Sequence, residues 1–255
     1  MHIAIRGSGP PLVMLHGWAM HGGIFEPLCA RLENSFTLHQ ADLPGHGASI
    51  GSATALTLDA VACEVASRTP AAVWLGWSLG GLVALHAAQA LPAAVRGLAM
   101  VCAGPRFVRG DDWPQGMDAS VFAGFANDLA RDYRATIDRF VLLEAQGSDH
   151  VRDDIRLLRQ QVFAWGAPDR DRLRDGLDLL QQSDLRAGLP SLAMPSLWLA
   201  GRRDRLVSPA TMLAAAALAP DASFVQIEHG GHAPFLSHAA DVASALVAFS
   251  ATLPA

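Results

Sequence analysis

The sequence of 255 residues lacks the features that mark membrane and exported proteins. No apolar run approaches the roughly 18 residues that a membrane-spanning helix needs. The N-terminal stretch MHIAIRGSGP has no basic segment followed by an apolar core, which a signal peptide would require. We therefore expect a soluble, cytoplasmic protein with neither an anchor nor a signal peptide.

Cysteine and basic charge are also scarce. The three cysteines, Cys29, Cys63 and Cys102, lie in apolar surroundings and form no C-x-x-C pair. This pattern predicts reduced packing residues, not a disulfide framework or a metal site, and we expect no metal and no cofactor. The formal net charge of −5 provides no general attraction to nucleic acid. Neither nucleic acid nor a membrane is therefore expected as a partner.

What the chain does contain is an alternation of short apolar strands and helices. It predicts a mostly parallel central sheet with helices on both faces. We expect strands at residues 2–6, 11–15, 36–41, 73–75, 95–102, 196–201 and 223–227. Between residues 105 and 186 we find only helical stretches, at 121–146, 151–165 and 173–180. We therefore expect an α/β core, residues 1–104 and 187–255, with an inserted helical cap at 105–186.

The chemistry centres on a strand, a tight turn and a helix around Gly76-Trp77-Ser78-Leu79-Gly80. This is a G-x-S-x-G nucleophile elbow, in which glycines two residues either side of the serine let strand and helix pass closely. Ser78 should project into a site, and the N–H of Leu79 should face a developing oxyanion. A chance match is the alternative, but the flanking strand and helix favour the elbow.

A second oxyanion donor is expected upstream of the elbow. The segment His16-Gly17-Trp18 directly follows a buried strand, where hydrolases of this type place the second N–H. We therefore predict that the N–H of Trp18 pairs with that of Leu79. Simple loop packing is the alternative for these residues.

A serine nucleophile needs a base and a group that orients the base, in the chain order Ser, acid, His. Asp204 and His232 each follow one of the last two predicted strands and satisfy this order. The alternatives are Asp184 and Asp221 for the acid, and His229 for the base. We predict a Ser78, Asp204, His232 triad, which would carry out acyl transfer to water.

With these residues assembled, the chain resembles the capped α/β-hydrolase family, and within it the pimeloyl-[acyl-carrier protein] methyl ester esterases of biotin synthesis. The resemblance covers nearly the whole chain. It is carried by His16-Gly17-Trp18, Phe36-Thr37-Leu38-His39, Asp42-Leu43-Pro44-Gly45, Trp74 to Ala84, Asp112-Trp113-Pro114, His232-Ala233-Pro234-Phe235 and Ser237-His238. It implies a monomeric carboxylesterase that releases methanol from a pimeloyl methyl ester on acyl-carrier protein.

The resemblance also implies that the cap segment Phe140-Val141-Leu142-Leu143-Glu144 contributes to substrate binding. The family pattern there resembles F-x-x-x-Q, so Glu144 is a departure that changes or removes a polar contact to the acyl chain.

Arginines in the cap suggest how a carrier protein would dock. Arg152, Arg156 and Arg159 share one helical face, and Arg139 lies on the preceding helix together with Arg131 and Arg134. Such a patch suits an acidic carrier and its phosphopantetheine phosphate. Because aspartates are interspersed, a solvated face with internal ion pairs is the alternative.

Two other functions remain open from the sequence. One is a broad carboxylesterase or C–C bond hydrolase that acts on free small molecules with the same triad. The other is a ligand-binding protein that keeps the fold without turnover.

Overall fold

The computed structural model describes residues 1–254 and contains one seven-stranded sheet with the order β1-β3-β2-β4-β5-β6-β7. The strands are β1 (Ile3–Gly7), β2 (Pro11–Leu15), β3 (Thr37–Ala41), β4 (Ala72–Trp77), β5 (Val95–Val101), β6 (Ser196–Gly201) and β7 (Ala222–Ile227). Strand β1 is antiparallel to β3, and all the other neighbouring strands are parallel. The predicted α/β architecture with a mostly parallel sheet is confirmed.

The burial of the strands follows their sequences. Every residue of β4 and β6 is buried, as expected for central parallel strands that are covered on both faces and are almost continuously apolar. The edge strand β1 is only partly buried and exposes Ile5. Because six of the strands are parallel, their carboxyl ends meet at one edge of the sheet, where the loops that follow them can assemble a site.

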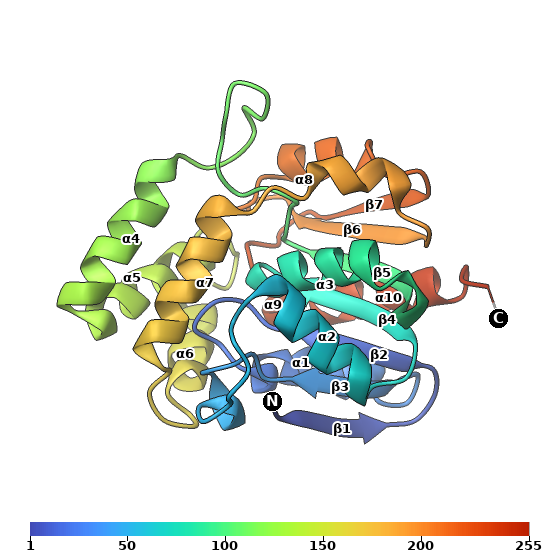
Figure 1. Cartoon of the computed structure of the whole chain (residues 1–255), viewed down its shortest axis with the longest axis horizontal. Helices are drawn as coiled ribbons and strands as arrows, with labels where there is room; N and C mark the ends of the chain where they lie inside the picture. Colours follow the sequence, from blue (N-terminus) through green and yellow to red (C-terminus); the bar gives the residue numbers. More distant parts are fainter. Residues whose placement is uncertain (255) are drawn as a thin grey trace.

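Helices cover both faces of the sheet (Figure 1). Their bounds are α1 (Glu26–Leu32), α2 (Leu58–Arg68), α3 (Leu79–Ala90), α8 (Pro209–Ala216), α9 (Pro234–Ser237) and α10 (Ala239–Ser250), with short 3-10 segments η1 (Gly22–Phe25), η2 (Gly47–Ser49), η3 (Pro92–Ala94) and η4 (Arg186–Ser191). Helix α2 packs on α3, and α1 packs on α10. None of the helices within residues 1–254 combines the length and apolarity that crossing a bilayer requires.

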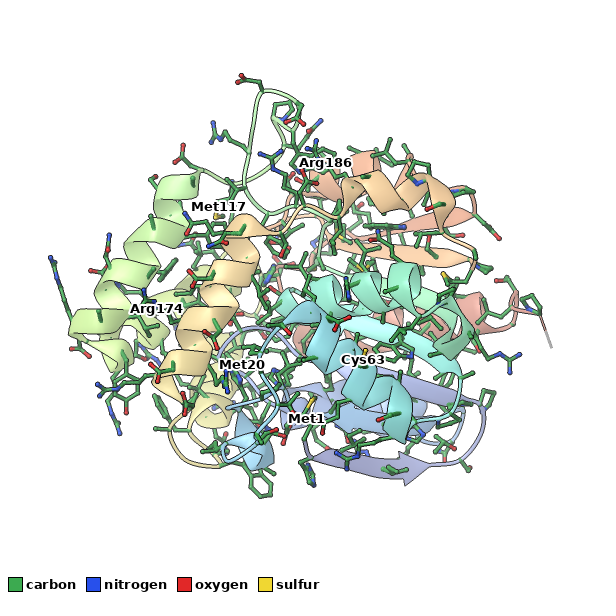
Figure 2. The ribbon with its side chains drawn as sticks, in the orientation of Figure 1. Met1, Met20, Cys63, Met117, Arg174 and Arg186 are labelled. Carbon is green, nitrogen blue, oxygen red and sulfur yellow. The ribbon has the colours of Figure 1, made fainter. Side chains whose placement is uncertain are left out.

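Four helices separate β5 from β6 along the chain and lie beyond the carboxyl ends of the parallel strands (Figure 1, left). They are α4 (Ala119–Arg131), α5 (Tyr133–Ala145), α6 (Val151–Val162) and α7 (Arg170–Gln182). We propose that residues 105–186 are the cap and that 1–104 and 187–255 are the core, of which Ala255 lies outside the described residues. Arg186 lies near the loop that precedes α4 (Figure 2), where it binds the Asp112 carboxylate at 2.6 Å.

Two expectations are wrong. The stretch 121–146 is not one helix, because Asp132 ends α4 and its side chain accepts a hydrogen bond from the N–H of Ala135 at the start of α5. Cys63 does not lie in apolar surroundings: it is exposed on α2 (Figure 2), whereas Cys29 and Cys102 are buried. The apolar neighbours of Cys63 in the sequence occupy the opposite face of an amphipathic helix.

Candidate active site

The nucleophile elbow is built by close backbone contacts that only glycine permits. A Cβ atom on Gly76 would lie 2.3 Å from the carbonyl oxygen of Gly80, and one on Gly80 would lie 2.2 Å from that of Leu15. Between them Ser78 has φ = 53°, a strained value for a non-glycine residue. The chain thus turns sharply from β4 into α3 with Ser78 at the apex.

Ser78 is joined to two side chains from distant loops. The Nδ1–H of His232 donates to Asp204 Oδ2 at 2.8 Å, which leaves Nε2 to accept from the Ser78 hydroxyl at 3.0 Å. Asp204 follows β6 and His232 lies between β7 and α9, so three strand ends supply the set. All three side chains are buried, and Ser78 is only 2% exposed.

Further hydrogen bonds fix the acid and the base. The second oxygen of Asp204, Oδ1, accepts from the N–H groups of Leu206 and Val207 at 2.8 and 3.0 Å. The indole N–H of Trp77, directly before the serine, donates to the carbonyl of His232 at 2.8 Å. The imidazole is therefore held in the tautomer and orientation that a general base for Ser78 requires.

The loop after β2 lies against the elbow. A Cβ on Gly17 would lie 3.3 Å from the Cβ of Ser78. Within residues 1–254, neither the Trp18 N–H nor the Leu79 N–H donates to another group. Leu79 is the first residue of α3, so its N–H has no partner inside the helix. The two donors are free to bind an oxyanion.

His16 supports this loop and is not an acid or base of the site. Its Nδ1–H donates to the carbonyl of Gly17 at 2.8 Å, and its Nε2 accepts from the N–H of Leu43 at 2.9 Å. Burial, together with the neighbouring His46, holds the pKa of His16 well below its usual value. The ring is therefore neutral and acts as a spacer between β2 and the segment after β3.

The predicted rivals lie elsewhere. His229 is exposed and contacts the Asp149 carboxylate at 3.0 Å, and Asp184 is bound by Arg186 at the surface. Asp221 is also exposed, in the turn before β7. None of these three residues forms a hydrogen bond or ion pair with the side chain of Ser78 or His232.

Helices α5 and α7 of the cap contact the loop that contains Trp18. The indole N–H of Trp18 donates to the carbonyl of Leu173 on α7 at 2.7 Å, and the Trp18 and Phe140 rings meet edge to face at 4.7 Å. Of the predicted segment 140–144, Phe140, Val141 and Glu144 are buried, Leu143 is partly buried, and Leu142 is 41% exposed. Leu142 therefore does not face the catalytic residues.

The predicted arginine patch is largely engaged in ion pairs. Arg156 contacts Asp153 at 3.2 Å and Arg159 contacts Asp138 at 2.9 Å, while Arg139 is paired with Asp128. Arg152 is exposed and has no ion pair within residues 1–254. The interspersed acids reduce the positive charge of this face.

Cys102 is a neighbour of the site that the sequence pattern missed. Its sulfur lies with Asp204 and His232 in a cluster whose ligand atoms are all within 4.8 Å of one another. The thiol donates to the carbonyl of Gly231 at 3.7 Å, and burial raises its pKa well above the usual value. The available signal was its position at the end of β5, beside the strand that delivers Asp204.

Comparison with known proteins agrees with this geometry. A model of the alpha/beta hydrolase family matches residues 12–245. The chain is 56% identical over 253 residues to the pimeloyl-[acyl-carrier protein] methyl ester esterase of Stenotrophomonas maltophilia (strain K279a), covering 99% of this chain and 97% of that protein. It is 57% identical over 254 residues to the protein of the same name from Xanthomonas campestris pv. campestris (strain B100), covering 100% of both.

Solved structures with low identity share the fold. An esterase from Exiguobacterium antarcticum superposes with a TM-score of 0.87 at 22% identity, covering 98% of this chain and 95% of that chain. The enol-lactonase from Burkholderia xenovorans LB400 gives 0.85 at 19% identity, covering 98% and 96%.

Proposed function

This chain belongs to the alpha/beta hydrolase family, and on that premise we propose that it is a serine carboxylesterase with Ser78 as its nucleophile. The observation that carries the proposal is the chain of hydrogen bonds from Ser78 through His232 to Asp204. A serine hydroxyl gains nucleophilicity only when a base takes its proton, and a buried carboxylate stabilises the imidazolium that results.

The reaction follows from these positions. Ser78 Oγ attacks the ester carbonyl while His232 takes its proton, and the N–H groups of Trp18 and Leu79 bind the oxyanion. His232 then gives the proton to the departing alkoxide, which leaves an acyl group on Ser78. Water, activated by His232 in the same way, releases the carboxylic acid and restores the serine.

We propose that the substrate is a pimeloyl-[acyl-carrier protein] methyl ester, from which methanol is released during biotin synthesis. The support is the identity of 56–57% with proteins that carry this name, which extends over the whole chain. Solved structures near 20% identity support only the fold, because the same fold hosts many reactions.

For the carrier protein we propose docking on the cap face that contains Arg139, Arg152, Arg156 and Arg159. An acidic carrier would compete with the cap's own aspartates for these side chains. Arg152 would be its first contact, since it needs no exchange of partners, and we propose that the enzyme acts as a monomer.

The test is methanol release from pimeloyl-[acyl-carrier protein] methyl ester, beside the same methyl ester without the carrier. We expect faster release from the carrier-bound ester, and a fall of roughly 10⁴-fold or more in Ser78→Ala. Ser67→Ala, which removes an exposed hydroxyl on α2, is the matched control and should retain activity.

The other outcomes separate the alternatives. Cleavage of the free ester alone would favour a broad carboxylesterase or C–C bond hydrolase acting on small molecules. Folded protein that cleaves neither ester and resists a covalent serine probe would favour a non-catalytic ligand-binding protein.

A further inference from the structure

Glu144 is a buried carboxyl group with no assigned partner beside the catalytic residues. It lies on α5 one turn after Phe140, so the two side chains share one face of the helix. Phe140 contacts Trp18 of the oxyanion loop, and burial together with the negative charge of Asp204 raises the pKa of Glu144. This face of α5 is therefore turned toward the oxyanion loop.

The carboxyl group has no hydrogen-bond partner. Glu144 is 1% exposed, and neither Oε1 nor Oε2 is satisfied by any group in residues 1–254. A buried ionised carboxylate without partners is very costly, whereas a neutral carboxylic acid is tolerated more easily. Burial and the negative Asp204 together raise the pKa of Glu144 well above its usual value.

Cations near α5 are already engaged elsewhere. Arg139 on α5 itself is paired with Asp128 of α4, and Arg159 of α6 is paired with Asp138. These pairs are half exposed at the surface of the cap. Arg203, from the loop next to Asp204, is partly exposed and bound to Asp149 and His229. No basic group in residues 1–254 therefore forms an ion pair with Glu144.

We propose that Glu144 is an uncharged carboxylic acid that donates its O–H to an ester or thioester oxygen of the bound acyl group. This inference rests on the proposed esterase function and identifies Glu144 as a residue that selects for uncharged ester groups. An ester offers only acceptor oxygens, so an unpartnered O–H is the complement that it needs. Glutamine at this position would also provide a donor, its side-chain N–H. Unlike the O–H of Glu144, that donor is not lost at high pH, because an amide does not ionise.

Ionisation of Glu144 would remove the donor and place a second negative charge beside Asp204. That charge would oppose the oxyanion that forms during attack by Ser78. The enzyme should therefore lose activity at alkaline pH, as the pH rises through the pKa of Glu144.

The experiment measures kcat/KM against pH for a soluble methyl ester in three variants and the native protein. Glu144→Gln should retain activity at alkaline pH where the native protein loses it. Glu144→Leu, which is close in size but has no donor, should show kcat/KM about fivefold lower and no alkaline decline. Glu33→Gln, which removes a partly exposed carboxyl directly after α1, should match the native profile. An unchanged alkaline decline in Glu144→Gln would overturn the proposal.

A second measurement needs no substrate and no turnover. Infrared spectroscopy of the native protein at neutral pH should show the carbonyl stretch of a protonated carboxylic acid, and this band should be absent from Glu144→Gln. A native spectrum without that band would show that Glu144 is ionised and would refute the proposal even if the enzyme hydrolyses esters. If instead the band is present and no ester is hydrolysed, the proposed function fails while the protonation state stands, and the substrate contact is refuted.

Discussion

At the scale of single residues, burial determines which groups act as bases and which are inert. His16, His46 and His232 are all buried near the elbow, but only His232 has a carboxylate on one ring nitrogen and a hydroxyl on the other. His46 donates from Nδ1 to the carbonyl of Pro44 at 3.0 Å, and its Nε2 is buried without a partner. Residue type alone does not distinguish these histidines, whereas their hydrogen bonds do.

His46 should make the protein less stable in acid. Burial lowers its pKa to about 4, below the value of about 6.5 expected in the unfolded chain. The unfolded state therefore binds more protons between these values, and the stabilisation present above pH 6.5 is lost as the pH falls towards 4. The full difference is worth about 3 kcal/mol.

Urea unfolding at pH 7.5 and pH 5 tests this. His46→Asn retains a donor for Pro44 but does not titrate, so its free energy of unfolding should fall less between the two pH values than that of the native protein. His229→Asn, which removes an exposed histidine, should behave like the native protein. Equal losses in the native protein and in His46→Asn would assign the acid sensitivity to other groups, of which His16 is the first to examine.

At the scale of elements, the position of Asp132 determines how the cap helices are divided. Its carboxylate accepts from the N–H of Ala135 at 3.1 Å and so caps α5, the helix that presents Phe140 and Glu144 to the site. Asp132→Ala should lower the free energy of unfolding by about 1 kcal/mol, because the N–H of Ala135 at the start of α5 loses its partner. Asp132→Asn should retain nearly all of the native free energy of unfolding, since asparagine caps helices about as well as aspartate. Thermal unfolding of both variants measures the difference, and equal losses would mean that charge and not the cap is responsible.

The strands and the elbow were predictable because local sequence determines them. Strands β2 and β6 are continuous apolar runs with the predicted bounds. The spacing around Ser78 identifies a turn that only glycine neighbours permit. The division between α4 and α5 was missed because both helices have the same apolar period, and a lone aspartate inside a helical pattern is usually a solvated surface residue.

At the scale of the whole molecule, the arrangement of the cap over the core could not be read from the sequence. The hydrogen bond from Trp18 to Leu173 joins residues 155 positions apart, and no local pattern predicts such a contact. The same holds for Glu144, whose burial depends on where α5 is packed. Ser78 is only 2% exposed where the cap covers the core. That Ser78, Asp204 and His232 meet was predictable from chain order and position, whereas the way in which the cap covers them was not.

Salt should distinguish the carrier-bound substrate from a free ester, because only the former would use the arginine face of the cap. The protein as a whole has a formal net charge of −5, so attraction of an acidic carrier must come from local groups such as Arg152. Raising the salt concentration from about 0.1 M to about 1 M shortens the screening length from about 10 Å to about 3 Å.

We expect kcat/KM for the carrier-bound ester to fall over this range of salt concentration, while kcat/KM for the free ester changes little. Arg152→Ala should lower the former at low salt and flatten its salt dependence, whereas Arg31→Ala, an exposed arginine on α1, should not. Parallel salt dependence for the two substrates would exclude the arginine face as the docking surface, and the carrier would then have to be recognised through the acyl chain and its phosphopantetheine arm.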